Sequence, residues 1–235
     1  MKNLDEEKAV GVITLINDPP PGGRKPMVPP EPASATNPDS ALVRRLRSDD
    51  QNALRTLMDS YWEPLVAFAR RILSGTGDPE DIAQTAFVRL WARRYRLDES
   101  GSLKALLYTI VRNASLDELR KRRRRETAQA GAPAPPSPRT PYEDVQGAEF
   151  QRLAAAAVAR LPERRREVFR LAREEGLSYQ EIAQVMELST QTVANHMSLA
   201  MADLRTALKP YLTDHRTTSD QGQAGGGMNR EQMDG

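Results

Sequence analysis

The chain of 235 residues contains no cysteine, which excludes disulfide bonds, thiol catalysis and cysteine-ligated zinc. It has only two histidines, His196 and His215, and neither lies at a metal-ligand spacing from other candidate ligands. We therefore expect no metal and no other cofactor. Aromatic residues make up 5% of the chain, a scarcity that predicts small helical modules in place of one large core.

Long apolar runs are also missing. The longest, such as VGVITLI at 10–16, are too short to span a bilayer. This run follows the acidic stretch LDEEKA, where a secretory signal would carry positive charge. We expect a cytoplasmic protein with no membrane insertion. There is no P-loop, no metal cluster and no nucleophile–base pair in credible context, so we do not expect an enzyme.

Proline-rich stretches divide the helix-compatible parts of the chain, and no alternating strand pattern of useful length is present. The sequence predicts an all-α protein with two small helical domains joined by a flexible Pro/Ala linker. The expected segments are a disordered N-terminal extension at 1–39, a first domain at 40–126, the linker at 127–147, a second domain at 148–212 and a disordered tail at 213–235.

Charge is concentrated locally, although the net charge of the chain is only +2. The run RKRRRR at 120–125 follows the predicted helix at 103–119. A basic block in a nearly neutral chain suggests a polyanionic partner. The alternative is a solvated helix end with no partner.

The stretch GLSYQEIAQVMELSTQTVANHMSLAMADLR at 176–205 predicts a helix-turn-helix. Ser178 and Glu181 have the spacing of a capping box at the start of the first helix. A break follows at Glu187–Leu188, and Ser189 can cap the second helix. Such a unit lays its second helix in the major groove of DNA.

The outward face of that second helix carries hydrogen-bonding side chains suited to reading base edges: Gln191, Thr192, Asn195, His196 and Ser198. Residues 188–202 contain no Lys, Arg, Asp or Glu, so phosphate contacts must come from elsewhere. The candidates are Arg164, Arg165, Arg166 and Arg170. We expect weak DNA binding by this domain alone. The alternative is a helical hairpin with a polar outer face.

Residues 81–91, DIAQTAFVRLW, form an amphipathic helix with an unexplained second face. Its apolar stripe consists of Ile82, Ala83, Ala86, Phe87, Leu90 and Trp91. The opposite face, which we call the α-face, consists of Asp81, Gln84, Thr85 and Val88. We expect the α-face to contact a partner.

Residues 103–119, LKALLYTIVRNASLDEL, form another amphipathic helix. Its expected buried stripe is Leu103, Leu106, Leu107, Ile110, Val111 and Ala114. Its expected exposed edge is Lys104, Tyr108, Arg112 and Ser115, with Asn113 and Arg120 beside it. An aromatic among cations and amides suits unstacked bases on a single strand. Taken alone, Tyr108 also fits simple half-buried packing.

Taken in order, three of these segments resemble the extracytoplasmic-function (ECF) group of bacterial RNA polymerase sigma factors. DPEDIAQTAFVRLW is similar to the family's core-polymerase-binding helix, and SLKALLYTIVRNASLDELRKRRRR to its minus-ten melting and recognition helix. RLPERRREVFRLAREEGLSYQEIAQVMELSTQTVANHMSLAMADLR resembles its minus-thirty-five-binding domain. The resemblance covers about 41–126 and 148–210, and the order and the linker also match.

The resemblance implies a function and its partners. A sigma factor binds the polymerase core, at the β′ clamp and the β subunit, and directs promoter-specific initiation. The α-face would meet the clamp, and the 176–205 unit would read minus-thirty-five DNA. For minus-ten DNA, the resemblance adds the loop Asp98–Ser102 and Asn113 as residues that shape a base pocket.

Five positions depart from the family's pattern. Thr85 stands where the family commonly has Glu or Asp, and Leu106 stands where it often has Trp. Glu187 replaces a common helix-ending Gly, and Ala194 and Leu199 stand where a basic residue is frequent. Phosphorylation of Thr85 by a Ser/Thr kinase would add about −1.5 to −2 charges and replace the missing carboxylate. The alternative is a tolerated substitution. The family also offers control by an anti-sigma factor.

Two other classes of function compete with this interpretation. A stand-alone helix-turn-helix transcriptional regulator would account for 176–205 but not for the α-face or the 103–125 helix. An anti-sigma-like adaptor would not need two DNA-reading surfaces.

Overall fold

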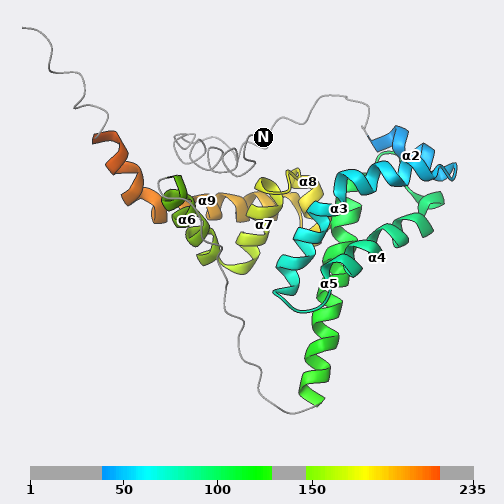
Figure 1. The fold of residues 1–235 in the computed structure, drawn as a ribbon. Coiled ribbons are helices and arrows are strands. Elements are labelled where there is room, and N and C mark those ends of the chain that lie inside the picture. The colour runs from blue at the N-terminus through cyan, green and yellow to red at the C-terminus, as the bar shows by residue number, and fades with distance from the viewer. Residues whose placement is uncertain (1–38, 129–146, 218–235) are drawn as a thin grey trace, which may run out of the picture. The chain divides into compact units, whose positions relative to one another are not determined.

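A computed structural model describes residues 39–128 and 147–217 of the chain. Every regular element in these two ranges is helical, which confirms the all-α prediction (Figure 1). No helix in them is both long and apolar enough to cross a membrane. The helices are α2 Asp39–Arg47, α3 Gln51–Leu73, α4 Pro79–Ala92, the 3-10 turn η1 Arg94–Arg96, α5 Leu103–Ala128, α6 Gly147–Arg160, α7 Glu163–Arg173, α8 Tyr179–Met186 and α9 Thr190–Thr217.

Four helices extend past the boundaries that the sequence indicated. Asp39 of the expected N-terminal extension begins α2, residues 127–128 of the expected linker belong to α5, Gly147 of the linker begins α6, and residues 213–217 of the expected tail belong to α9. The stretches 127–128 and 213–217 contain no glycine or proline that would stop a helix. Residues 1–38, 129–146 and 218–235 lie outside the described residues.

The described residues fall into two compact units. The larger unit contains α2 to α5, α7 from Glu167, α8 and the start of α9 up to His196. The smaller unit contains α6, the start of α7 up to Arg166, and α9 from Met197 onward. The division of the chain at the linker, as the sequence suggests, stays a prediction.

The core of the larger unit is made where α3, α4 and α5 pack pairwise (Figure 1). The rings of Trp62 and Phe87 stack across α3 and α4 with centroids 6.2 Å apart, and Phe68 lies 5.1 Å from Tyr108. The largest fully buried aliphatic side chains of these three helices are Leu57, Leu65, Leu73, Leu90 and Leu107. Burying a leucine of this kind contributes about 1.5–3 kcal/mol, so this apolar packing holds the helices in place.

The smaller unit combines apolar burial with two arginine contacts. Val158 and Leu161 are buried, as are Leu204 and Leu208 of α9. Arg165 pairs with Asp203 at 2.7 Å, and Arg166 donates to the Ala159 carbonyl at 2.7 Å.

Short polar side chains start the helices that carry the candidate surfaces. The Asp78 carboxylate accepts from the backbone N–H groups of Glu80 and Asp81 at the start of α4, where Pro79 is the first helical residue. The predicted capping box of Ser178 and Glu181 is confirmed at α8. These caps satisfy N–H groups that a helix leaves unpaired, and they fix where each helix begins.

The end of α8 forces a residue with a side chain into the left-handed region. Glu187 has φ 56° and ψ 47°. The N–H of Leu188 donates to the Ala183 carbonyl and the N–H of Glu187 to the Gln184 carbonyl, a pattern that usually places glycine at this position. The turn to α9 thus has the predicted place and length. The left-handed conformation costs Glu187 free energy that a glycine at this position would not lose.

Glu187→Gly is expected to raise the free energy of unfolding by about 0.5–1 kcal/mol, because glycine adopts positive φ without a clash of its Cβ. Urea unfolding of the full chain measures the change. Glu187→Ala removes the same charge but keeps the Cβ, so it serves as the matched control and should give no gain. An equal gain from alanine would show that charge, and not backbone conformation, sets the stability at this position.

Candidate functional site

The helix α4 divides into a buried and an exposed face as the sequence predicts. Ala83, Ala86, Phe87 and Leu90 are buried against α3 and α5. Ile82 and Trp91, expected in the same stripe, are only half-buried. The first and last residues of the apolar stripe, Ile82 and Trp91, are therefore partly open to solvent.

The α-face lies on the side of α4 that the core leaves open. Asp81 and Gln84 are exposed, Thr85 is half-buried, and Val88 is 62% exposed. The structure thus leaves all four side chains accessible, as a binding surface requires, while their partner stays a prediction.

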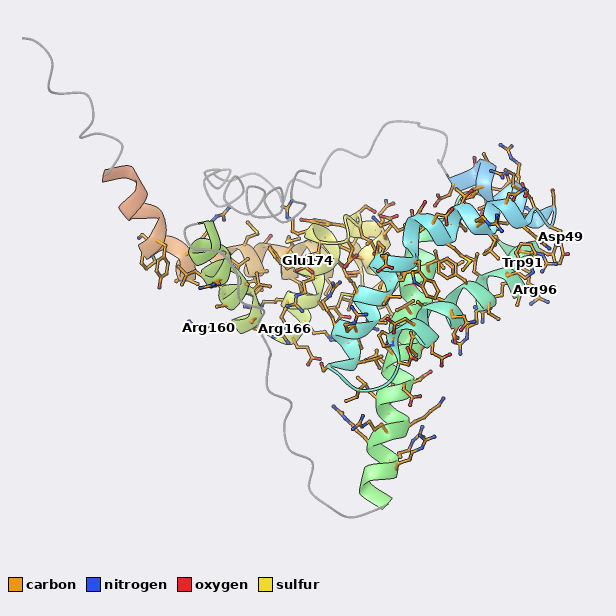
Figure 2. The ribbon with its side chains drawn as sticks, in the orientation of Figure 1. Asp49, Trp91, Arg96, Arg160, Arg166 and Glu174 are labelled. Carbon is orange, nitrogen blue, oxygen red and sulfur yellow. The ribbon has the colours of Figure 1, made fainter. Side chains whose placement is uncertain are left out.

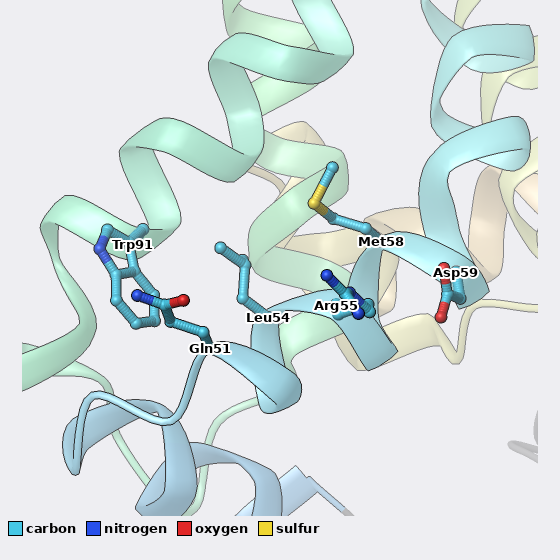
Figure 3. Close-up of a pocket in the computed structure, with 6 residues that line it drawn as sticks. All are labelled: Gln51, Leu54, Arg55, Met58, Asp59 and Trp91. Atoms are coloured by element: carbon cyan, nitrogen blue, oxygen red, sulfur yellow. The ribbon is translucent and has the colours of Figure 1, made fainter.

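An open pocket of about 550 Å³ lies next to this face, between α3 and the end of α4 (Figure 3). The lining residues are Gln51, Leu54, Arg55, Met58, Asp59 and Trp91. Trp91 is three residues from Val88, so both lie on one side of α4. Sequence periodicity placed Trp91 in the core and missed this pocket, although a tryptophan at the end of a stripe could have signalled it.

A polar cluster fixes the end of α4 beside Trp91. The Asp49 carboxylate accepts hydrogen bonds from Arg94 and from the Tyr95 hydroxyl, and both bonds lower the pKa of Asp49. The Arg94 guanidinium lies 4.3 Å from the centre of the Trp91 ring. Figure 2 labels Asp49 and Trp91 at this end of the larger unit. This cluster joins the start of α3 to the end of α4 and holds the Trp91 ring in place.

The expected exposed edge of α5 is covered in the structure. Tyr108 is 1% exposed, Arg112 8% and Ser115 0%, and Lys104 is half-buried. The prediction that this edge is open to solvent is therefore wrong. The expected buried stripe is confirmed, apart from Leu106, which is half-buried.

The residues that cover the edge belong to α7, α8 and the turn between them, within the same compact unit. The Tyr108 hydroxyl donates to the Glu175 carboxylate, and Arg112 pairs with Glu167 at 2.7 Å. Lys104 donates to the Gly176 carbonyl at 3.1 Å. Periodicity shows which side chains share a helix face but not which distant residues cover it, so no signal in the sequence could have found these partners.

The loop before α5 is ordered by its own hydrogen bonds. The Asp98 carboxylate accepts from the Ser100 N–H at 2.9 Å and from its hydroxyl at 2.8 Å, and these bonds lower the pKa of Asp98. The Ser102 hydroxyl donates to Glu181 at 2.6 Å and accepts from the Ala105 N–H. Asn113 is half-buried beside this edge, and Arg120 is exposed and paired with Asp117. Asp98 and Arg120 therefore stay open to solvent, whereas Ser102 takes part in the covered edge.

The predicted reading face of α9 is open to solvent. Gln191, Asn195 and Ser198 are exposed, and Thr192 and His196 are half-buried. The Gln191 amide donates to the Asn195 amide oxygen at 3.0 Å, which fixes both side chains over one turn of the helix. Leu199 is 46% exposed beside them, and Val193 and Met197 are buried as predicted.

The four candidate phosphate-binding arginines differ in their surroundings. Arg164 is exposed, while Arg165 and Arg166 are half-buried in the contacts of the smaller unit described above. Arg170 lies 3.6 Å from Glu174. Arg164 is thus the most exposed of the four.

Comparisons with known proteins match the two helical parts to two regions of one family. Sigma-70 region 2 matches residues 57–125, and sigma-70 region 4 matches residues 151–204. A probable RNA polymerase sigma factor, RfaY of Xanthomonas campestris pv. campestris, is 32% identical over 67% of this chain, and the match spans 41% of that relative's length. The ECF RNA polymerase sigma factor RpoE of Cereibacter sphaeroides is 30% identical over 70% of this chain and 92% of its own length.

The chain belongs to the ECF RNA polymerase sigma factors. A solved structure of the sigma factor RpoE in complex with the anti-sigma factor NepR from Bartonella quintana is similar to this ECF sigma factor, with a TM-score of 0.50 at 25% identity over 66% of this chain and 96% of that one. ECF sigma factors are transcription initiation factors, not enzymes, and they bind RNA polymerase core and promoter DNA. The family predicted from the sequence is confirmed, and a stand-alone regulator is not favoured because region 2 also matches.

The covered edge of this sigma factor predicts a pH dependence of its stability. Burial, and after it the charge and hydrogen bond of Glu175, raise the pKa of Tyr108 above its usual value near 10. The folded protein therefore keeps Tyr108 neutral at pH values where the unfolded chain ionises it. This contribution to stability is full below about pH 10 and is lost as the pH rises beyond it.

Tyr108→Phe is expected to reduce the fall in unfolding free energy above pH 10 by about 1.4 kcal/mol per pH unit, the contribution of one such group. Urea unfolding at several pH values between 9 and 11.5 measures the slope. Tyr211→Phe, at a tyrosine that is 43% exposed, is the control and should leave the slope unchanged. A Tyr108→Phe slope equal to that of the wild type would contradict the assignment.

Proposed function

We propose that this ECF sigma factor acts in the cytoplasm, binds RNA polymerase core through the α-face of α4, and directs promoter-specific initiation. The observation that carries the proposal is the 62% exposure of Val88 on a helix whose other face buries Ala83, Ala86, Phe87 and Leu90. Asp81, Gln84 and Thr85 surround it, and the pocket at Trp91 extends the same surface onto α3. The β′ clamp is the partner that the family implies for this face, with the β subunit as a second contact.

DNA recognition is proposed to be divided between two helices. The start of α9 reads the minus-thirty-five element through Gln191, Thr192, Asn195, His196, Ser198 and Leu199, which its structure leaves open. Arg164, Arg165, Arg166 and Arg170 supply phosphate contacts. The minus-ten element is proposed to meet Asp98, Ser102, Lys104, Tyr108, Arg112, Asn113 and Arg120. The capture of flipped bases there costs a few kcal/mol, which cationic and aromatic side chains can offset.

Val88→Arg is expected to weaken binding to RNA polymerase core at least about tenfold, because it places a charge in the apolar centre of the proposed contact. Titration of core with fluorescently labelled chain measures the affinity. Tyr211→Arg is the matched control, since Tyr211 is also an exposed apolar side chain but lies outside the proposed surface. If neither the wild-type chain nor either variant binds core, the proposed function is wrong.

Control of the α-face is proposed to act through Thr85. Its hydroxyl stands beside exposed Gln84 and Val88 on α4, and it is half-buried, so a phosphoryl group there would reach solvent and a partner alike. Phosphorylation would restore the negative charge at this position of the face. A charge pair desolvated at an interface can contribute on the order of 1–3 kcal/mol to binding.

Thr85→Glu is expected to bind core polymerase about fivefold to 150-fold more tightly than the unmodified chain, following that range of free energy. Thr85→Gln is the matched control, with the same shape and no charge, and should bind like the wild type. Titration of core with each labelled chain separates them. Equal affinities for the Glu and Gln variants would reject the switch and leave an anti-sigma factor, such as the one bound in the RpoE–NepR structure, as the remaining means of control.

A further inference from the structure

The loop of residues 97–102 carries Asp98 and Ser102, two of the residues that the proposed function assigns to minus-ten DNA. We name it the minus-ten loop. Its two ends are fixed by burial, since Leu97 is 8% exposed and Leu103, the first residue of α5, is 2% exposed. Asp98, between these two leucines, is exposed. The loop therefore offers polar side chains to solvent from two buried end points.

Hydrogen bonds within the minus-ten loop shape its turn. The Asp98 carboxylate accepts from Ser100, as described above, and the Gly101 N–H donates to the Asp98 carbonyl at 3.2 Å. Bonds of this kind between close neighbours determine the local conformation of a turn. They do not determine where the turn stands relative to the helices, which requires contacts from another element.

Helix α2 supplies two such contacts, one from each of its ends. The carboxylate of Asp39, the first residue of α2, accepts from the Leu103 N–H at 2.7 Å. Arg47, the last residue of α2, pairs with Glu99 of the minus-ten loop at 3.4 Å. The loop and the start of α5 are therefore joined to α2 at two separate points.

The Asp39 contact also caps α5. The Ser102 hydroxyl accepts from the Ala105 N–H at 3.1 Å, which satisfies one of the N–H groups that the first turn of a helix leaves unpaired. Asp39 satisfies a second one, that of Leu103. A hydrogen bond to a carboxylate is stronger than one to a neutral acceptor, and negative charge is favourable at a helix N-terminus. The position of the first turn of α5 thus depends on a residue of α2.

Helix α2 can fix the position of the loop because it is itself held firmly. Val43 and Leu46 are both 0% exposed, and α2 packs on α3 and on η1 (Figure 1). Arg45 pairs at 2.8 Å with Asp50, the residue that caps α3. The short turn between α2 and α3 is therefore fastened at the start of α3, and α2 forms a rigid support.

We propose that Asp39 and Arg47 are positioning residues for minus-ten recognition, which hold the minus-ten loop and the start of α5 in the arrangement that takes a base. The proposal rests on the proposed function, because that function assigns the loop to DNA. Both residues precede residues 57–125, the part that matches sigma-70 region 2. A binding site selects its ligand well only while its supporting residues hold it within about 0.5 Å of the productive geometry.

The test measures base selectivity in the holoenzyme. RNA polymerase core is combined with the full-length chain and mixed with a pool of short single-stranded DNA of randomised sequence, and the bound DNA is sequenced. The selectivity is the ratio between the frequencies of the most and the least enriched base at the most selective position. Affinity for core and the urea unfolding of each variant are measured beside it.

Asp39→Ala removes the acceptor and is expected to lower the selectivity at least about threefold, because a displaced loop discriminates less against the wrong base. Its affinity for core should change less than about twofold, since α2 acts on the loop and not on the α-face. Asp39→Asn keeps an oxygen that can accept from the Leu103 N–H and should retain most of the selectivity. Glu63→Ala is the matched control: it removes one exposed carboxylate of α3 that takes no part in these contacts, and it should leave the selectivity unchanged.

The pair of Arg47 and Glu99 gives a second test with little risk to folding, because the two side chains are 46% and 41% exposed. Arg47→Glu places two negative charges together and is expected to lower the selectivity about twofold, in keeping with the modest strength of exposed ion pairs. Combining Arg47→Glu with Glu99→Arg restores an attractive pair in the reverse order. The combined variant should recover selectivity relative to Arg47→Glu alone.

Wild-type selectivity in both Asp39→Ala and Arg47→Glu would overturn the proposal. Equal losses in Asp39→Asn and Asp39→Ala would overturn the role of the hydrogen bond, and no recovery in the combined charge-swap variant would overturn the role of Arg47. A parallel fall in core affinity and selectivity would show general damage to the fold in place of positioning. If the sigma-factor function itself is wrong, the wild-type chain does not bind core. If only the positioning is wrong, core binding and selectivity persist in every variant.

Discussion

The buried carboxylate of Glu175 constrains much of the larger unit, because a charge removed from water must find partners inside the protein. Its partners, Arg71 and Tyr108, come from α3 and α5, which are themselves packed on α4. The turn between α7 and α8 is therefore attached to the same three-helix core that presents the α-face. The apolar core sets where the helices lie, and the charged contact sets which of their edges are open.

The sequence allowed the helices and most of their faces to be predicted, since hydrophobic periodicity and capping residues are local signals. The stripe from Ala83 to Leu90 and the capping box at Ser178 are examples that the structure confirms. The exposure of Tyr108 and Arg112 could not be predicted in this way, because Glu175 and Glu167 lie 67 and 55 residues further along the chain. A helical pattern assigns a residue to a face, and only the tertiary contact decides whether that face meets solvent. The roles of the proposed binding residues likewise depend on partners outside the chain.

The three proposed binding surfaces of this sigma factor differ in how accessible they are to a partner. The α-face and the start of α9 are accessible, with Val88 and Leu199 exposed as large apolar side chains. The edge of α5 is covered, and its donors are satisfied by the chain itself.

The hydrogen bond between Gln191 and Asn195 has a consequence for fidelity. In the free protein the two amides partly satisfy each other, so neither depends wholly on water. A base pair that separates the two amides must replace the hydrogen bond that is lost. A base edge with the wrong donors and acceptors cannot do so, and it leaves two desolvated amides without partners. The loss of binding free energy is then larger than that of a single missing contact. For the same reason, sites built for hydrogen bonding reject analogues that cannot form the bonds. If this face reads the minus-thirty-five element as proposed, a pair of neutral side chains bonded to each other sets a threshold that an incorrect promoter sequence has to overcome.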